Sequence, residues 1–381
     1  MSEKPSVDAP VARQEIPARL AGYFLSMAKL GASDLHIKVN TPATFRVRSA
    51  LRSAKEQPLT AEQISQMISA LLSPEQREAF GQNGQVDLAR ENSIGDRFRI
   101  NVFRQRGLPS LAVRRVTRDI PSFAELHLPE NIERITRETQ GLVLLSGPTG
   151  CGKSTTIASI LEYINATRRC HIVTIEDPIE YLYTDKKALV SQREIGIDVP
   201  DFNLATRAML REDPDILLIG EMRDRDTLQA ALQAAVTGHL VLGTVHASTA
   251  PQTIQRILEL FPPETRPLIR QGLAYNLKAV LCQRLLPSVK DGIDRVPAVE
   301  ILRVDPVARQ LIETGRDNEL PDVIASCQNG NMQSFSQSLL ELIEGDLIDP
   351  KEAYAIAPNP EELKMRLKGI KQTQTGLIAR G

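Results

Sequence analysis

The chain has 381 residues and a composition close to that of ordinary globular proteins, with 42% hydrophobic and 24% charged residues. At about 150 residues per domain this length predicts two or three domains, and the composition excludes a disordered tail protein and a fibrous repeat. The formal net charge of −1 hides a division, because residues 1–120 carry 18 basic and 12 acidic side chains whereas the remainder carries 28 and 35. Only 15 residues are aromatic and none is tryptophan, which argues against stacking of bases or sugars on aromatic side chains.

The cysteines indicate neither a disulfide framework nor a zinc site, because the four of them lie far apart and form no C-x-x-C pair. The N-terminus lacks the apolar segment of a signal peptide, and no apolar run approaches the roughly 18 residues that span a bilayer. We therefore expect a cytoplasmic protein in a reducing compartment, whose contact with a membrane is made only through partners.

The first part of the chain predicts a flexible tail at residues 1–15 and a small α+β domain at residues 16–117. Apolar residues at helical spacing predict a first helix that ends at Gly31, and capping boxes at Thr60 and Ser73 begin two more. Alternating polar and apolar residues predict strands at residues 34–39, 45–47, 96–103 and 111–116.

Arginine is concentrated near the end of this domain, where lysine is absent and the only acids are Glu91 and Asp96. The arginines of this segment are Arg90, Arg97, Arg99, Arg104, Arg106, Arg114, Arg115 and Arg118. Planar guanidinium groups at this density suggest recognition of carboxylates or phosphates. A solvated strand face explains them equally well.

A second domain follows a predicted linker at residues 118–124, which contains the turn-forming Asp119-Ile120-Pro121. Short apolar strands then alternate with helices, at residues 142–145, 172–175, 216–219 and 240–242. Strands that are apolar on both faces belong in a parallel sheet covered by helices, so residues 125–290 predict an α/β domain. Residues 291–381 are predicted to be mostly helical.

The strongest signal in the sequence is a complete phosphate-loop pattern, G-x-x-x-x-G-K-[ST], between an apolar strand and a helical stripe. It consists of Gly147, Pro148, Thr149, Gly150, Cys151, Gly152, Lys153, Ser154 and Thr155. The glycines let the backbone N–H groups surround a polyphosphate. Lys153 is expected to place its ammonium on the outer phosphates, and Ser154 to give its hydroxyl to Mg²⁺.

Acidic residues follow two of the predicted strands and are candidates to act beside the phosphates. Glu221 comes directly after one strand, and Glu176, Asp177 and Glu180 follow another. Carboxyl ends of parallel strands are where ligands bind in open α/β sheets. A solvated acid at a strand end is the plain alternative for each of them.

Two of the five histidines, His239 and His246, flank the strand that begins at residue 240. An offset of seven residues puts them on opposite faces, which argues against a shared metal. His246 follows the carboxyl end of the strand and can point toward the phosphates, whereas His239 precedes the strand. Taken alone, each would be explained as a core or surface histidine.

Together these segments resemble the secretion ATPase superfamily (the GspE/PilT family), and within it the PilT/PilU branch of type IV pilus retraction ATPases. Residues 174–181 are similar to its Asp box, residues 211–224 to its Walker B region and residues 237–246 to its His box. Residues 307–312 resemble the A-I-R-N-L-I signature of retraction motors, and residues 359–368 look more like PilU than PilT.

The resemblance implies a RecA-like P-loop NTPase domain, an N-terminal α+β domain of the PAS-like type and a C-terminal helical segment. It implies a Mg²⁺-dependent ATP hydrolase that works as a homohexamer and powers pilus retraction through a platform protein of the inner membrane. It assigns Glu221 as the catalytic glutamate, Glu180 as a second essential acid, and His239 and His246 as links between nucleotide state and domain position. Arginines of the N-terminal domain would reach the phosphates, and those that match the family pattern are Arg97, Arg99 and Arg114.

Other functions stay open from the sequence. The PilU-like tail favours an accessory ring that binds a paralogous retraction ATPase, and a type II secretion-like ATPase is a further possibility within the family. The absence of a four-cysteine zinc site disfavours a pilus extension motor. A nucleic-acid motor would use the arginine-rich segment to grip phosphates, although we expect no nucleic-acid partner. A nucleotide-dependent binding module without turnover is the fourth alternative.

The phosphate loop departs from the family in one residue, because Cys151 stands where Ser is usual. A thiol beside a helix N-terminus could have a lowered pKa and be oxidisable. The simpler interpretation is a small substitute that the loop tolerates.

Overall fold

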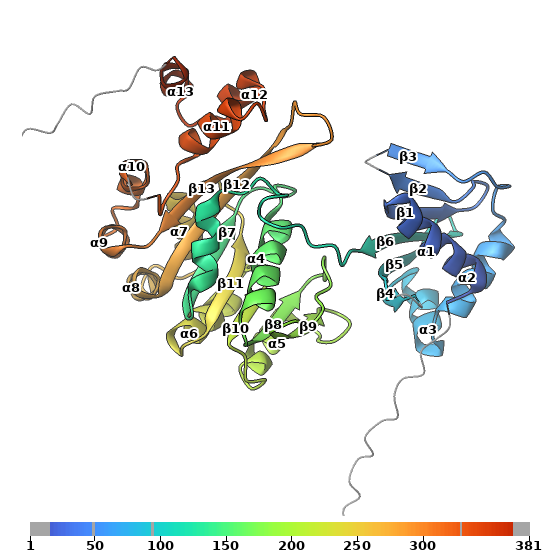
Figure 1. Ribbon diagram of the computed structural model, residues 1–381. Helices are drawn as coiled ribbons and strands as arrows, with labels where there is room; N and C mark the ends of the chain where they lie inside the picture. Colours follow the sequence, from blue (N-terminus) through green and yellow to red (C-terminus); the bar gives the residue numbers. More distant parts are fainter. Residues whose placement is uncertain (1–15, 48–49, 93–94, 328–329, 369–381) are drawn as a thin grey trace, which may run out of the picture. The chain divides into compact units, whose positions relative to one another are not determined.

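A computed structural model describes residues 16–47, 50–92, 95–327 and 330–368. The tail predicted at residues 1–15 lies outside this part of the chain. The protein divides into two compact units, Met1–Arg118 and Asp119–Gly381. We call them the N-terminal unit and the C-terminal unit. Figure 1 labels helices and strands of both units and colours the chain by residue number.

The N-terminal unit is an antiparallel sheet with strand order β3-β2-β1-β6-β5-β4, covered by helices on one face. Its helices are α1 (Ala18–Leu30), α2 (Ala61–Leu71) and α3 (Pro74–Asn83). Its strands are β1 (Ala32–Lys38), β2 (Thr44–Val47), β3 (Ala50–Ser53), β4 (Gln85–Glu91), β5 (Arg97–Gln105) and β6 (Leu108–Val116).

Local sequence signals account for the helix boundaries of this unit. Gly31 ends α1 in the left-handed conformation at φ 59°, and the capping boxes at Thr60 and Ser73 begin α2 and α3 as predicted. The core is formed where α1 meets the sheet, with the rings of Phe24 and Phe98 stacked at 4.0 Å between centroids.

The C-terminal unit is built on a seven-stranded sheet with the order β13-β12-β7-β11-β10-β8-β9. Its strands are β7 (Gly141–Ser146), β8 (His171–Glu176), β9 (Leu189–Glu194), β10 (Ile216–Ile219), β11 (Leu240–Val245), β12 (Leu277–Pro287) and β13 (Arg295–Arg303). All pairs are parallel except that of β12 with the edge strand β13. The predicted α/β architecture is therefore confirmed, and the four predicted strands correspond to β7, β8, β10 and β11.

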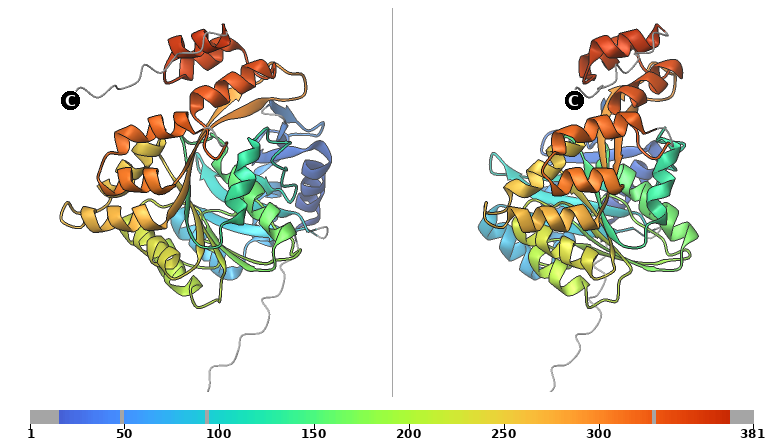
Figure 2. Two further views of the ribbon diagram at one scale, coloured as in Figure 1. Left: turned by 60° about the vertical axis from the view of Figure 1, so that its left-hand side comes forward. Right: turned by 90° about the vertical axis from the view of Figure 1, so that its left-hand side faces the viewer.

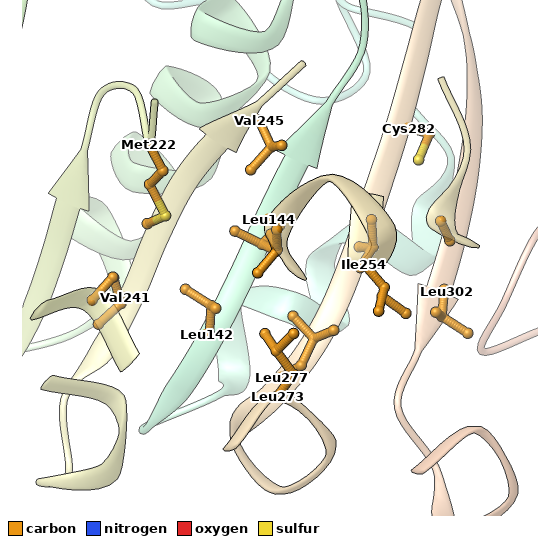
Figure 3. Close-up of a cluster of buried hydrophobic side chains, with 14 of the residues drawn as sticks. Leu142, Leu144, Met222, Val241, Val245, Ile254, Leu273, Leu277, Cys282 and Leu302 are labelled. Carbon is orange, nitrogen blue, oxygen red and sulfur yellow. The ribbon is translucent and has the colours of Figure 1, made fainter. Parts of the chain in front are cut away.

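Helices cover both faces of this sheet, because its strands are buried on both sides. One face packs against η1 (Glu130–Arg137) and α4 (Lys153–Thr167). The other packs against α5 (Phe202–Met209), α6 (Arg225–Val236), α7 (Ala250–Glu259) and α8 (Arg266–Asn276). Figure 3 shows how Leu142 and Leu144 of β7 point into this second cluster beside Ile254 of α7 and Leu273 of α8.

The region after residue 290 begins with β13 and only then becomes helical. Its helices are α9 (Pro306–Glu313), η2 (Asp317–Glu319), α10 (Leu320–Ser326), α11 (Phe335–Glu344), α12 (Pro350–Ile356) and α13 (Pro360–Leu367). In Figure 2 these orange and red helices lie along the β13 edge of the sheet, where α9 packs on α8, α10 on α7, and α11 on β13. The sequence did not predict β9, β12 or β13.

Candidate nucleotide site

The phosphate loop connects the inner strand β7 to α4 and depends on glycine for its shape. Gly147, Gly150 and Gly152 have φ values of 151°, 78° and 88°, which other residues rarely adopt. A Cβ atom at Gly147 would also lie 2.5 Å from the backbone oxygen of Gln283, and one at Gly152 would lie 2.8 Å from Gln283 Nε2. The loop is therefore held tightly against β12.

Gln283 of β12 holds the loop through both ends of its buried side-chain amide. Its Nε2 donates to the carbonyl oxygen of Cys151 at 2.8 Å, and its Oε1 accepts from Thr156 Oγ1 at 2.8 Å. Only 4% of Gln283 is exposed. The loop and the first turn of α4 are thus fixed to a neighbouring strand before any ligand binds.

The loop presents the groups that a polyphosphate needs. No side chain caps the N-terminus of α4, so its first N–H groups are directed at the cavity and, with the helix dipole, favour an anion there. Lys153 Nζ lies over the loop and donates to the carbonyl oxygens of Gly147 at 2.8 Å and Pro148 at 3.1 Å. Phosphate oxygens can replace these two carbonyls as acceptors.

An open cavity of about 440 Å³ lies between the loop and the carboxyl ends of β8, β10 and β11. Its charged and titratable lining residues are Lys153, Glu176, Asp177, Glu180, Tyr181, Glu221, Arg223, His246 and Arg295. Sequence reasoning expected acids from two strands to meet near the phosphates, and both Glu221 and the 176–180 segment line this one cavity.

The carboxylate of Glu221 contacts one arginine and one histidine side chain. Its Oε1 lies 2.5 Å from Arg223 Nε and 2.9 Å from His246 Nε2. Partial burial raises the pKa of Glu221, but the hydrogen bond and charge of Arg223, together with His246, outweigh it, and the pKa lies below its ordinary value. Glu221 is therefore ionised at neutral pH and can accept a hydrogen bond or a proton.

The end of β8 carries a buried acid, Glu176, and the segment after it an exposed one, Glu180. Glu176 is 9% exposed, and burial raises its pKa to about 7 although hydrogen bonds from Thr174 and Gln192 lower it. Glu180 is exposed in the cavity wall. Tyr181 fixes this segment to the phosphate loop, because its hydroxyl lies 2.9 Å from Thr155 Oγ1.

Comparison with known proteins shows the family of the chain. The model of the type II/IV secretion system proteins matches residues 12–365. The chain belongs to this family. It is similar to the type IV pilus ATPase PilU of Pseudomonas aeruginosa, with 35% identity over 90% of this chain and 89% of that protein. It is also similar to the type IV pilus retraction ATPase PilT of the same organism, with 39% identity over 88% of this chain and 96% of that protein.

A solved structure agrees with these relatives. The crystal structure of the pilus retraction motor PilT with bound ADP superimposes with a TM-score of 0.83 and 39% identity, over 91% of this chain and 98% of that chain. The resemblance and the fold class predicted from the sequence are confirmed by this match and by the family model. The residues that the family resemblance singled out can now be located in the structure.

The two histidines of the His box lie at opposite ends of β11. His246 follows the strand and contacts Glu221, whereas His239 precedes it, and its Nδ1 lies 3.1 Å from the carbonyl oxygen of Ala234 and 3.2 Å from Thr237 Oγ1. The structure thus brings His246 into the candidate site, and His239 lies a strand length away from it.

The three arginines assigned by the family resemblance belong to the N-terminal unit. Alternation along β5 places Arg97 and Arg99 on the face of the sheet opposite its helices, and Arg99 is the register partner of Arg114 on β6. Arg114 Nε donates to Asp34 Oδ1 at 2.9 Å, and most of its side chain is exposed. These arginines form one basic strip on that face.

Cys151 is an inert part of the loop rather than an activated thiol. It is 4% exposed, and burial raises the pKa of its thiol although Lys153 and nearby backbone donors lower it. The suggestion that the helix N-terminus lowers this pKa is therefore wrong. Loss of solvation in the packed loop outweighs the field of the helix.

Sequence reasoning missed several residues that shape the site. Gln283 follows the apolar run 279–282 of β12 and is itself followed by Arg284, so the sequence does not show that this one polar side chain is buried. Arg223 stands two residues after Glu221 in the Walker B segment. Gln192 of β9 could not be assigned, because its contact with Glu176 depends on how β8 and β9 pair. Tyr181 could not be assigned, because its contact with Thr155 depends on how the segment after β8 lies against α4.

Neither a preformed metal cluster nor a membrane-spanning helix is present in the described part of the chain. Residues 16–368, apart from the three short gaps given above, contain no group of three or more His, Cys, Asp or Glu side chains arranged to hold a metal ion. Within the same ranges no helix is both long and apolar enough to cross a bilayer.

Proposed function

We propose that this protein is an ATP-hydrolysing motor that powers retraction of type IV pili. The observation that carries the proposal is a complete phosphate loop facing an ionised Glu221 in one cavity. Similarity to PilT and PilU over about nine tenths of the chain supports retraction as the direction of pilus movement. The structure of PilT with bound ADP, which has the same fold with a TM-score of 0.83, supports nucleotide binding by this protein.

Nucleotide binding follows from the loop. Backbone N–H groups of residues 147 and 149–155, at the loop and the N-terminus of α4, surround the phosphates. Lys153 turns from the loop carbonyls to the outer phosphate oxygens. The residues present fit a magnesium ion, because the hydroxyl of Ser154 lines the cavity and Glu221 lies nearby. Bound Mg²⁺ supplies neutralisation of phosphate charge.

Glu221 and the residues around it are proposed to have different roles in hydrolysis. The carboxylate of Glu221 orients the attacking water and accepts its proton. Arg223 and His246 hold that carboxylate in place at 2.5 and 2.9 Å and keep it ionised. Glu180 is a second acid of the cavity wall, and His239 is proposed to transmit nucleotide state through β11 to the rest of the molecule.

The active assembly is proposed to be a homohexamer that hydrolyses ATP with Mg²⁺ as cofactor. The N-terminal unit supplies Arg97, Arg99 and Arg114 to the phosphates, and the movement of units upon hydrolysis acts on a platform protein of the inner membrane. The protein is then cytoplasmic and peripheral at the inner membrane, with membrane contact only through partners.

A second candidate is an accessory ring that assists a paralogous retraction ATPase. The observation that favours it is the 35% identity to PilU over 90% of this chain. Both candidates share the same nucleotide site and differ in whether the protein retracts pili without the paralogue.

ATP turnover by the purified full chain tests the enzymatic part of the proposal. We expect Mg²⁺-dependent hydrolysis that DNA and RNA do not stimulate, and loss of both nucleotide binding and turnover in Lys153→Ala. Strong stimulation by nucleic acid with tight, salt-sensitive binding would favour a nucleic-acid motor. A folded protein that binds ADP but never hydrolyses ATP would leave only a nucleotide-dependent binding module.

A further inference from the structure

Glu176 is a buried acid in the wall of the nucleotide cavity that the proposed hydrolysis does not use. It is the last residue of β8 and lines the cavity together with Lys153 and Glu221. The neighbouring strand end is in close contact, because a Cβ atom at Gly220 would lie 3.3 Å from Glu176 Cα. The carboxyl group is therefore set in a rigid part of the sheet, beside the space that phosphates would occupy.

A network of hydrogen bonds fixes the orientation of this carboxyl group. Thr174 Oγ1 donates to Glu176 Oε1 at 2.7 Å, and Gln192 Nε2 donates to the same oxygen at 3.2 Å. The amide of Gln192 is itself held, because its Nε2 also donates to the carbonyl oxygen of Tyr181 and its Oε1 accepts from the backbone of Tyr183. The backbone N–H of Glu180 also donates to the Glu176 carboxyl group, so its position is fixed by donors from three residues.

The charge around Glu176 decides how easily it is protonated. Burial raises its pKa to about 7, hydrogen bonds from Thr174, Gln192 and the backbone of Glu180 lower it, and the charge of Glu180 adds to the increase. The other titratable or charged groups on the surrounding elements are Asp177, Tyr181 and Tyr183 after β8, Glu194 on β9, Glu221 and Arg223 after β10, His246 after β11, and Lys153 of the phosphate loop. Burial thus brings the pKa of this carboxyl group toward neutral pH.

We propose that Glu176 takes up a proton from solvent when nucleotide phosphates enter the cavity, so that the protein binds its nucleotide together with a proton. The inference rests on the proposed nucleotide site. ADP keeps a net negative charge when Mg²⁺ is bound to it, and it enters a cavity where Glu180 already disfavours the ionised carboxylate. A like charge beside a buried site shifts the carboxyl toward its neutral form. The proton ends on a Glu176 carboxylate oxygen, and no other bond changes.

The sign of the pH dependence follows from linkage. A group whose pKa rises on binding takes up a proton, so nucleotide affinity is highest below the pKa of the free protein and falls as pH increases above it. Because that pKa is about 7, full protonation in the complex corresponds to about half a proton taken up per nucleotide at pH 7. Protonation of the nucleotide itself is the same for every variant and cancels in the comparison.

Calorimetry of ADP binding in the presence of Mg²⁺ tests the inference with the full chain. Titrations in PIPES and in Tris at pH 7 report proton uptake from the difference in binding enthalpy, because the two buffers differ in ionisation enthalpy. We expect net proton uptake in the wild type to exceed that in Glu176→Gln, which keeps the shape and the acceptor oxygen, by up to about half a proton. Equal net uptake in the two proteins would overturn the inference.

Thr174→Val provides an independent test if Glu176→Gln fails to fold. Removal of the Thr174 hydroxyl deletes a bond that stabilises the carboxylate, so the pH at which proton uptake is half-maximal should move upward. An unchanged profile would contradict the role of Glu176. ADP binding with equal net uptake in the wild type and Glu176→Gln would refute the inference yet leave the nucleotide site intact, whereas no ADP binding by the wild type would refute the proposed function itself.

Discussion

Gln283 should decide whether the phosphate loop is formed in the absence of ligand. The substitution Gln283→Leu keeps the approximate volume of the side chain but removes both of its hydrogen bonds. It leaves the carbonyl of Cys151 and the hydroxyl of Thr156 buried against β12 without the partners they have at 2.8 Å.

The cost can be worked from these two bonds. A typical hydrogen bond contributes about 1 kcal/mol net, and a buried polar group left without a partner costs about 1–3 kcal/mol. Because the site is 4% exposed, water does not easily replace the lost partners, and the substitution should reduce the free energy of unfolding by about 2–4 kcal/mol. For a unit of this size that corresponds to a fall in Tm of roughly 5–10 °C.

Thermal unfolding with and without ADP measures both consequences. We expect the lower Tm in Gln283→Leu, together with ADP binding weakened by about tenfold or more, since the loop must be ordered during binding. The matched control is Gln271→Leu, the same chemical change at an exposed position of α8, which should alter stability by less than about 0.5 kcal/mol. Equal Tm values and equal ADP affinities for Gln283→Leu and the wild type would refute the role given to Gln283.

The other predictions concern catalysis and reactivity. Glu221→Gln should keep ADP affinity and lower kcat by about 10²–10⁴-fold, and an undiminished kcat would remove Glu221 from its role. Arg223→Ala should raise the pKa of Glu221, because it removes a hydrogen-bond donor and a positive charge that lower this pKa. In a pH–rate profile, the acidic loss of activity should therefore begin at a higher pH in Arg223→Ala than in the wild type. The buried thiol of Cys151 should react with a thiol reagent far more slowly in the folded chain than in the unfolded chain, and fast labelling would contradict its burial. Inactive Arg97→Ala and Lys153→Ala subunits, mixed in one assembly, should recover part of the ATPase activity if Arg97 acts across a subunit interface, and no recovery at any ratio argues against it.

Features that depend on local sequence were predictable. The phosphate loop, the Thr60 and Ser73 caps and the Gly31 terminus all follow from residues within a few positions of one another. The apolar strands at the centre of the C-terminal sheet were equally clear, because burial on both faces leaves an uninterrupted apolar run. The acids that follow two of these strands converge on one cavity because parallel strands end at the same edge.

Features that depend on distant pairing were not predictable. Gln283 contacts the loop across 132 residues of sequence, and nothing in either segment specifies the other. The same holds for Gln192, whose contact with Glu176 requires that β9 pairs with β8 in one register. The strand β13 was missed because Pro297 and Glu300 interrupt its apolar pattern, whereas in the structure it pairs with β12 at the sheet edge. The environment of Cys151 was also missed, because sequence shows the neighbouring helix but not the burial that outweighs it.

Pilus retraction in living cells tests the central claim most directly. The measurement is fluorescence imaging of labelled surface pili in a strain that lacks this gene, complemented either with the wild type or with Glu221→Gln. We predict excess surface pili that extend but do not retract in the deletion strain, restored retraction with the wild-type gene, and no restoration with Glu221→Gln. Normal retraction in the deletion strain, or a strain without pili, would contradict the account.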